Sequence, residues 1–170
     1  KTSMPELTKV QTYNRPFFYP EIVDLIGTLI KNGFKVHIVS ASNVWSVRWM
    51  VIQHLNPRLE ARFGKGVTIA GEQVFGINTV MWDTTTDQFI KDEFYLKDSG
   101  YSTLHANVLH HTLITRHIVP PVSAYHGKSA IIQKHIGTDA PFLVVGDSPN
   151  DFPMLKSAQH KLWIARLEKP

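Results

Sequence analysis

The sequence predicts an α/β protein whose strands form a parallel sheet, and three observations carry this prediction. Short, β-rich apolar runs alternate with segments whose apolar residues recur at helical spacing. These runs have too little polar alternation for a sheet with one solvated face. Polar turns follow two of them before the next helix begins. Strands that alternate with helices favour a parallel sheet with right-handed crossovers.

The first predicted unit starts with an amphipathic helix that has Pro20 in its first turn and Gly33 at the position of a left-handed C-terminal cap. The run after it is rich in β-forming residues and is expected to be a buried strand. Ser42 or Asn43 then caps a second helix that ends near Leu55. The predicted helix, strand, turn and second helix cover residues 20–33, 34–39, 40–43 and 44–55.

The same pattern returns at the C-terminal end. A helical segment stops at Gly137, and a buried strand, a polar loop, a short helix through Met154 and Leu155 and a third strand follow. The helix is expected over residues 129–135 and the strand after it over 142–145. The polar loop is expected over 146–151 and the last strand over 162–165. The segment 67–118 is different, and we interpret it as β-hairpins or an excursion inserted into the sheet.

The composition excludes several classes of protein. With 170 residues, of which 43% are hydrophobic and 19% charged, the chain has the composition of one globular domain. Its apolar stretches are far shorter than the roughly 20 residues that span a bilayer, so we expect no membrane partner. The 18 basic residues are scattered among 14 acidic ones, which disfavours a nucleic-acid partner. Because the chain has 0 cysteines, disulfides and thiolate metal sites are excluded, and the compartment stays open between cytoplasmic and periplasmic or secreted.

Polar residues gather after two of the predicted strands, at Ser40–Asn43 and at Gly146–Asp151. The carboxyl ends of parallel strands meet at one crevice, which is where ligands bind in open α/β sheets. Asp147 and Asp151 can direct two carboxylates toward one hard cation such as Mg²⁺. The alternative is a capping turn, in which these aspartates only accept hydrogen bonds from the N–H groups of the next helix.

Lys128 stands near the start of the helix that precedes the second strand, within a Gly-Lys-Ser sequence. A phosphate-binding P-loop needs a glycine five positions before Gly127, where this chain has Val122, so a P-loop is excluded. Lysines at helix starts are more often solvated than catalytic. The ammonium group is nevertheless suited to pair with a phosphate or with the acidic loop.

Together these residues resemble three of the four motifs of the haloacid dehalogenase superfamily of phosphotransferases. Ser40, at the end of an apolar strand, resembles the second motif. Lys128 resembles the third motif, and Gly146–Asp151 resembles the fourth, Gly-Asp-x-x-x-Asp. The pattern is most similar to the phosphoserine phosphatase-like branch, which includes phosphorylcholine phosphatase-like members. The resemblance spans nearly the whole chain and implies a Rossmann-like parallel sheet of the superfamily's type.

The resemblance implies Mg²⁺-dependent hydrolysis of a phosphomonoester, with a small phosphorylated metabolite as substrate and a phosphoaspartyl intermediate. Covalent catalysis divides one difficult displacement into two steps, and fixed positive groups stabilise the charge on the transferring phosphoryl group. The implied metal ligands are Asp147 and Asp151, with Asp151 holding either the metal's waters or Lys128. The implied catalytic residues are Ser40, Lys128, Asp147 and Asp151, and the implied phosphate-binding residues are Ser40, Ala41, Ser42, Lys128 and Asn150.

The family's first motif, Asp-x-Asp-x-(Thr or Val), which supplies the nucleophile, is absent from the printed sequence, because no two aspartates are separated by a single residue. The nearest imitation, Trp82–Asp87, follows Ser40 in the chain, and we interpret it as a surface turn. In the family, the strand with the first motif lies between the strands that end at the second and fourth motifs. Its omission would leave a slot about 10 Å wide, lined by unpaired backbone groups.

We therefore expect the nucleophile on an upstream segment that is cleaved, left out or a separate chain, so that the printed chain alone is inactive. Residues 1–15 would be the tail of a helical cap, and residues 16–170 the core, with 67–118 as its β-rich excursion. One alternative is a catalytically dead relative that binds phosphate or a partner, and an upstream Asp-x-Asp segment would distinguish the two. A receiver or nucleotide-binding domain is a weaker alternative, because a first-strand aspartate and a glycine-rich loop are both missing.

Overall fold

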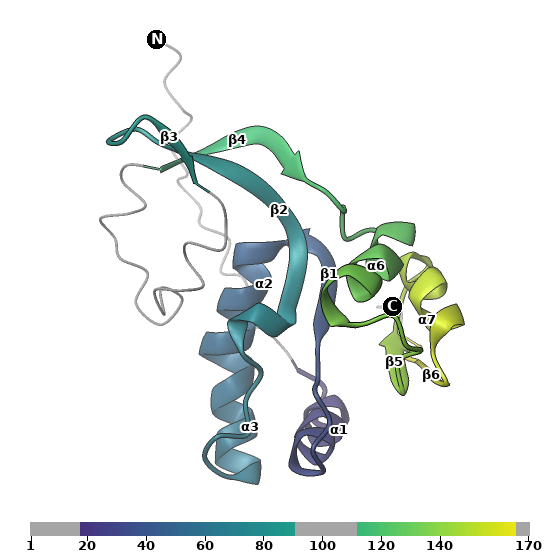
Figure 1. Ribbon diagram of the computed structural model, residues 1–170. Coiled ribbons are helices and arrows are strands. Elements are labelled where there is room, and N and C mark those ends of the chain that lie inside the picture. Colours follow the sequence, from purple (N-terminus) through teal and green to yellow (C-terminus); the bar gives the residue numbers. More distant parts are fainter. Residues whose placement is uncertain (1–17, 91–111, 166–170) are drawn as a thin grey trace, which may run out of the picture.

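The computed structural model describes residues 18–90 and 112–165, which form a mixed α/β fold (Figure 1). The α/β prediction is confirmed, but parallel and antiparallel strands both occur, so the sheet is not parallel throughout. The helices and strands in chain order are α1 (Pro20–Lys31), β1 (Ile38–Asn43), α2 (Val44–Met50), α3 (Asn56–Phe63), β2 (Val74–Asp83), β3 (Gln88–Ile90), β4 (Thr112–Val119), α6 (His126–Ile131), β5 (Leu143–Gly146), α7 (Phe152–Ser157) and β6 (His160–Trp163).

Helix α1 forms where the apolar spacing predicted it. Pro20 lies in its first turn, and Gly33 follows it in the left-handed conformation with a φ of +83°. The helix packs against α3, and both contribute to the main core of the molecule. The buried residues of that core are Val23, Val47, Val51, Leu55, Leu59, Ile69 and Val74.

Strand β1 begins four residues later than predicted and includes the four residues that were expected to form a turn. The reason is its partner, because β1 pairs in parallel with β2 as far as Asn43, which lies opposite Ile77. The segment 34–39 was also expected to be buried, and none of its residues is fully buried. Among the described residues, strand pairing of β1 is observed with β2 alone.

The second predicted helix begins at Val44, as expected, and Asn43 is its cap. Asn43 Oδ1 accepts hydrogen bonds from the backbone N–H groups of Trp45 at 3.0 Å and Ser46 at 3.3 Å. The helix does not end near Leu55, because a π-helical turn over Val51–Leu55 joins α2 to α3. Pro57 lies in the first turn of α3 and does not interrupt the helix, because proline lacks only an N–H group that the first turn does not require.

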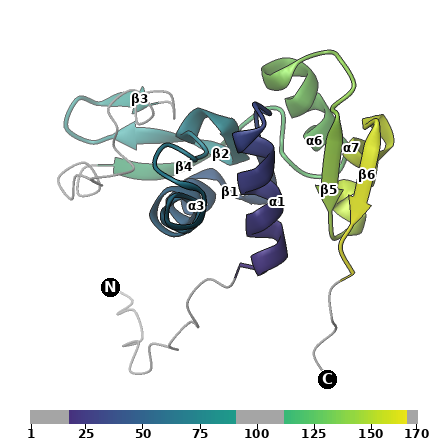
Figure 2. The same ribbon diagram turned by 90° about the horizontal axis from the view of Figure 1, so that it is seen from below.

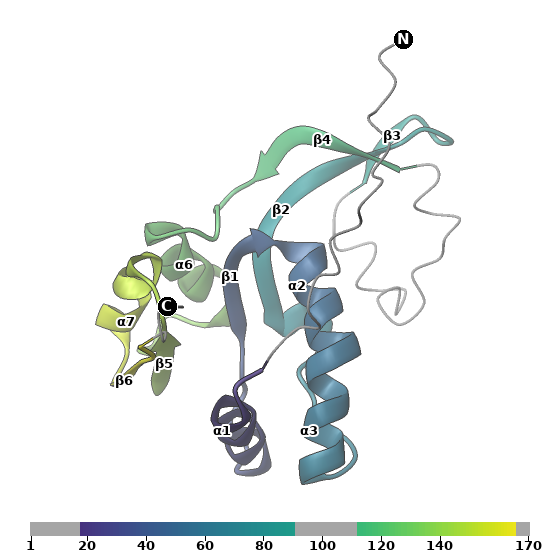
Figure 3. The same ribbon diagram turned by 180° about the vertical axis from the view of Figure 1, so that it is seen from behind.

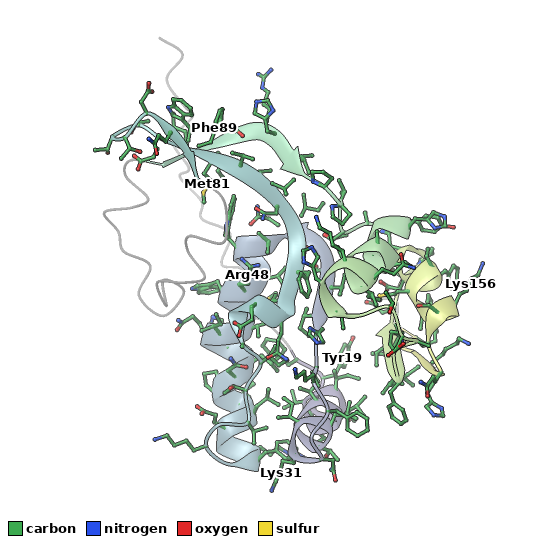
Figure 4. The ribbon with its side chains drawn as sticks, in the orientation of Figure 1. Tyr19, Lys31, Arg48, Met81, Phe89 and Lys156 are labelled. Atoms are coloured by element: carbon green, nitrogen blue, oxygen red, sulfur yellow. The ribbon has the colours of Figure 1, made fainter. Side chains whose placement is uncertain are left out.

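Strand β2 belongs to two different pairings. Its first residues pair in parallel with β1, and its later residues pair antiparallel with β3 and β4. The later part of β2 forms, together with β3 and β4, an arm that extends from the core (Figure 3). Figure 4 shows Phe89 near the end of this arm, and Arg48 beside the core part of β2. Of the β-hairpins or excursion expected within 67–118, one hairpin is present, between β2 and β3, and β4 adds a further antiparallel pairing with β2. Residues 91–111 lie outside the described part of the chain.

Arg48 ties α2 to the start of β2. Its side chain is buried, and Nε donates to the carbonyl oxygens of Gly71 at 3.0 Å and Val74 at 3.1 Å. Gly76 makes the close packing of the two elements possible, because a Cβ there would lie 2.6 Å from the Val44 backbone. This face of β2 is therefore fixed against α2.

A second sheet consists of β5 and β6, which pair in parallel from Leu143 opposite His160 to Gly146 opposite Trp163. The two strands are displaced by one and two residues from the predicted ranges. Helix α6 begins three residues before the predicted start and continues through a π-helical turn over Ile132–Ile136. A small separate core holds this part together, and its buried residues are Ile132, Val144, Met154, Leu155 and Ala158.

No strand pairing joins the two sheets within the described part of the chain. Figures 1 and 2 both show the order β2, β1, β5, β6, with α6 and α7 on the β5 side and α3 on the other. Within residues 18–90 and 112–165, β1 ends one sheet and β5 ends the other. Near the amino ends of the two strands, the rings of Phe34 and Phe142 are in contact, with centroids 4.9 Å apart. We call this interruption of strand pairing the β1–β5 break.

Candidate functional site

A buried ion pair lies where α6 approaches the loop after β5. Lys128 Nζ donates to Asp151 Oδ1 at 2.5 Å, and the side chains are only 7% and 4% exposed. Burying two charges costs solvation free energy, which is recovered only when each charge has good partners. The alternative that Lys128 is a solvated residue at the start of a helix is therefore excluded.

The second carboxylate oxygen of Asp151 organises the loop. Oδ2 accepts three hydrogen bonds of 3.0 Å, from the backbone N–H groups of Asp147 and Ser148 and from the Ser148 hydroxyl. Burial would raise the pKa of Asp151, but the hydrogen bond and charge of Lys128, together with the loop donors, hold that pKa below its ordinary value. Asp151 is therefore an ionised anchor, and both of its oxygens are engaged.

Two glycines permit this close packing. A Cβ at Gly146 would lie 2.6 Å from the Asp151 Cβ, and a Cβ at Gly127 would lie 1.6 Å from the Val122 carbonyl oxygen. Neither distance is possible for real carbon atoms, so glycine is required at both positions. The Gly-Lys pair at 127–128 and the Gly-Asp pair at 146–147 thus have a direct steric basis.

Ser40 lies in β1, and its side chain is fixed by its own backbone. Ser40 Oγ accepts a hydrogen bond of 3.1 Å from the N–H of Ser42, which leaves the hydroxyl proton able to serve another acceptor. The Ser40 carbonyl oxygen accepts a hydrogen bond of 2.6 Å from the hydroxyl of Ser123. Ser123 is completely buried and precedes α6, so it links the end of β1 to the segment that carries Lys128.

The structure therefore joins the predicted site residues into two groups. Lys128, Asp147 and Asp151 are connected by hydrogen bonds around the loop after β5. Ser40, Ala41 and Ser42 lie on β1. Asn150 lies in the loop after β5 and is exposed. Sequence reasoning missed Ser148, which donates to Asp151, and Ser123, because nothing in Pro120–Ser123 marks a hydroxyl whose partner lies 83 positions away.

These residues fit a magnesium ion only in part. In the described ranges there is no group of three histidine, aspartate or glutamate side chains that could hold a metal. Mg²⁺ often takes one or two protein carboxylates and completes its shell with water and phosphate oxygens. Asp147 can serve as one such ligand, whereas direct binding by Asp151 would require loss of its present hydrogen bonds.

The Asp83–Asp87 segment is a surface turn, as expected. Asp83 Oδ1 accepts hydrogen bonds from the backbone N–H groups of Thr85 at 2.8 Å and Thr86 at 3.3 Å, where β2 turns into β3. These bonds hold the pKa of the exposed Asp83 carboxyl below its ordinary value. The carboxylate is engaged in local turn formation, at the end of the arm.

No protein-family model matches the chain, and a search of curated proteins gives no match. None of the helices in the described ranges combines the length and apolar character needed to cross a membrane. The functional assignment therefore rests on the geometry of the site and on the motifs in the sequence.

Proposed function

We propose that this chain is the part of a haloacid dehalogenase-type phosphomonoesterase that carries the second, third and fourth motifs. The single observation that carries the proposal is the strand order β2, β1, break, β5, β6. In that superfamily, the strand with the nucleophile lies between the strands that end at the second and fourth motifs. The β1–β5 break falls between the strands associated with Ser40 and Asp147.

The exposure of β1 supports the same proposal. The run 34–39 has the sequence of a buried parallel strand, yet its residues Ile38 and Val39, which lie in β1, are only half-buried. A strand edge left without a partner presents unpaired N–H and C=O groups, which invite pairing with another strand. One further strand, spaced about 4.8 Å from each neighbour, would cover this edge and the edge of β5 together.

In this proposal each described residue has a limited role. Lys128 brings a fixed positive charge, and the ionised Asp151 positions it. Ser40 donates its hydroxyl proton to a phosphoryl oxygen, while Ser42 N–H holds the Ser40 oxygen from the other side. Asp147 is the carboxylate that would bind Mg²⁺, which supplies electrostatic stabilisation of the phosphate when bound. The attacking aspartate comes from the additional strand.

Fixed charges of this kind act because they are already in place when negative charge develops on the transferring group. Lys128 is nearly excluded from water and is held by a short ion pair, so little reorganisation is needed. Removal of one such group typically costs several kcal/mol of transition-state stabilisation, or a hundredfold or more in rate.

The test is hydrolysis of p-nitrophenyl phosphate by the full natural chain, with and without Mg²⁺. We expect Mg²⁺-dependent activity that falls about a hundredfold or more in Lys128→Ala and in Asp147→Asn. Lys156→Ala is the matched control, because Lys156 is exposed on α7 and should leave the rate unchanged. Full activity in both site variants would refute the assigned roles. A folded full chain with no activity would instead favour a phosphate-binding relative without catalysis.

A further inference from the structure

A pocket of about 680 Å³ lies against β2 and the face of α6 that is directed to it, and the proposed phosphatase site does not use it. Its walls come from the segment before β1, from β2 with the turn that precedes it, from the start of α2, from the end of β4 and from α6 with its π-helical turn. Ser40, Lys128 and Asp147 are not among its lining residues.

The lining of the pocket is rich in basic residues. Lys35, Lys134, His37 and His135 belong to its lining, with Arg48 deeper in the wall and Glu72 as the acidic residue. Both histidine rings stack on the ring of Phe75. The ring centroids are 6.2 Å apart for His37 and Phe75 and 5.3 Å apart for Phe75 and His135. Burial and the charge of Lys35 lower the pKa of His37, which agrees with a positive environment.

The lining also contains apolar residues. They are Val119, Pro120, Pro121 and Ile131, and Ile131 is 3% exposed. Phe75 lies opposite Val39 of β1, whereas Asn78 lies opposite Val119 of β4. These positions on β2 are three residues apart, or about 10 Å along an extended strand. The lining therefore combines basic and apolar residues and follows β2 over about this length, which is roughly that of a small aromatic acid.

Two polar atoms in the wall lack hydrogen bonds within the part of the chain that is described. They are His37 Nδ1 and Asn78 Oδ1, and both are shielded from solvent. A shielded polar atom without a hydrogen-bond partner is unfavourable. A bound molecule that supplies such a partner therefore stabilises the site once the polar side chain turns toward that molecule. Both side chains belong to the lining of the pocket.

We propose that this pocket binds a small organic anion, with its phosphate or carboxylate group near Lys35 and Lys134 and its apolar part against Pro121 and Ile131. Ammonium and imidazole groups provide charge-assisted hydrogen bonds to an oxyanion. The apolar residues contribute by removing hydrocarbon surface of the ligand from water. An inorganic ion would use only the basic residues, and a neutral aromatic molecule only the apolar ones.

The test is a titration of the isotope-labelled full chain, followed by backbone NMR shifts. The probes are phenylphosphonate, which cannot be hydrolysed at its carbon–phosphorus bond, benzoate as the carboxylate, and phenol as the uncharged molecule. We expect phenylphosphonate or benzoate to shift the resonances of Phe75, Asn78 and His135, and phenol to bind more weakly. The stronger of the two acids identifies the preferred oxyanion.

Lys134→Gln should weaken binding of that acid about fivefold, because one partly exposed charge pair is lost. Lys65→Gln is the matched control, since Lys65 is exposed in the loop after α3 and does not line the pocket. Shifts confined to Ser40 and residues 146–151, or equal weakening by both lysine variants, would overturn the proposal. Either result leaves the phosphatase assignment untouched, because that assignment depends on other residues.

Discussion

Lys128 Nζ and Asp151 Oδ1 are 2.5 Å apart, and both side chains are almost completely removed from solvent. The pair connects α6 to the loop after β5, and the other oxygen of Asp151 holds the backbone of that loop. Helix position and loop conformation therefore depend on one carboxylate. This dependence makes Asp151 the most informative residue for tests of stability.

Asp151→Asn should lower the free energy of unfolding by about 3–5 kcal/mol, because it leaves the buried ammonium of Lys128 without its charge partner. Urea denaturation at pH 7 measures the change. Asp24→Asn provides the control, since Asp24 pairs at 2.5 Å with Arg62 on the surface, where side-chain exposures are 40% and 54%. That substitution should cost less than about 1 kcal/mol. Equal effects of the two changes would contradict the account of the buried pair.

The contribution of Asp151 should also depend on pH in a defined direction. Its pKa in the folded chain lies below its ordinary value, so the unfolded state takes up a proton at higher pH than the folded state. The stabilisation is then present above the unfolded pKa of about 3.9 and is lost as the pH falls through the lower folded value. Urea denaturation from pH 7 to pH 2 should show the wild-type chain and Asp151→Asn converging only below about pH 4. A constant difference across that range would show that the pKa of Asp151 is not lowered.

Gly127→Ala and Gly146→Ala should both destabilise the fold, with the larger loss at Gly127. The added Cβ meets a backbone carbonyl oxygen at 1.6 Å in the first case and a side-chain carbon at 2.6 Å in the second. Overpacking of this kind costs about 1–3 kcal/mol or more. Gly137→Ala is the control, since a Cβ there meets nothing within 4 Å and its φ of 162° is extended. Thermal unfolding of the three variants decides the point, and a stable Gly127→Ala chain would refute the close approach to Val122.

Ser123→Ala removes the hydrogen bond to the Ser40 carbonyl, which then stays without that partner. We expect a loss of about 1–2 kcal/mol in unfolding free energy, as is usual for a buried hydrogen bond. Ser157→Ala is the comparison, because Ser157 bonds to the Met154 carbonyl at 2.8 Å within an exposed helix end. If the two alanine variants unfold at the same denaturant concentration, Ser123 does not hold β1 to the segment before α6.

Local signals in the sequence were sufficient for several elements. Pro20 and Gly33 delimit α1, and Asn43 caps α2, because each acts within one helical turn of its own position. The limits of β1 could not be predicted in this way, since they depend on pairing with β2, about 35 positions later. The turn predicted at Ser40–Asn43 is therefore strand. The second helix was predicted to end near Leu55, and its continuation into α3 was not predicted.

For the candidate site, residue types were predictable and contacts were not. The Gly-Asp-x-x-x-Asp spacing places Asp151 back toward Asp147, as one turn of a tight loop requires. Whether Asp151 would face a metal or Lys128 was open in the sequence, and the short ion pair favours Lys128. The pocket around Phe75 joins residues from five parts of the chain, so no local pattern could have indicated it.

The most direct test of the central claim is an experimental structure of the full natural chain. We predict a strand that is hydrogen-bonded to both β1 and β5, with an aspartate at its carboxyl end beside Lys128 and Asp147. Direct pairing of β1 with β5, or a β1–β5 break that no strand enters, would contradict the proposed phosphatase assignment.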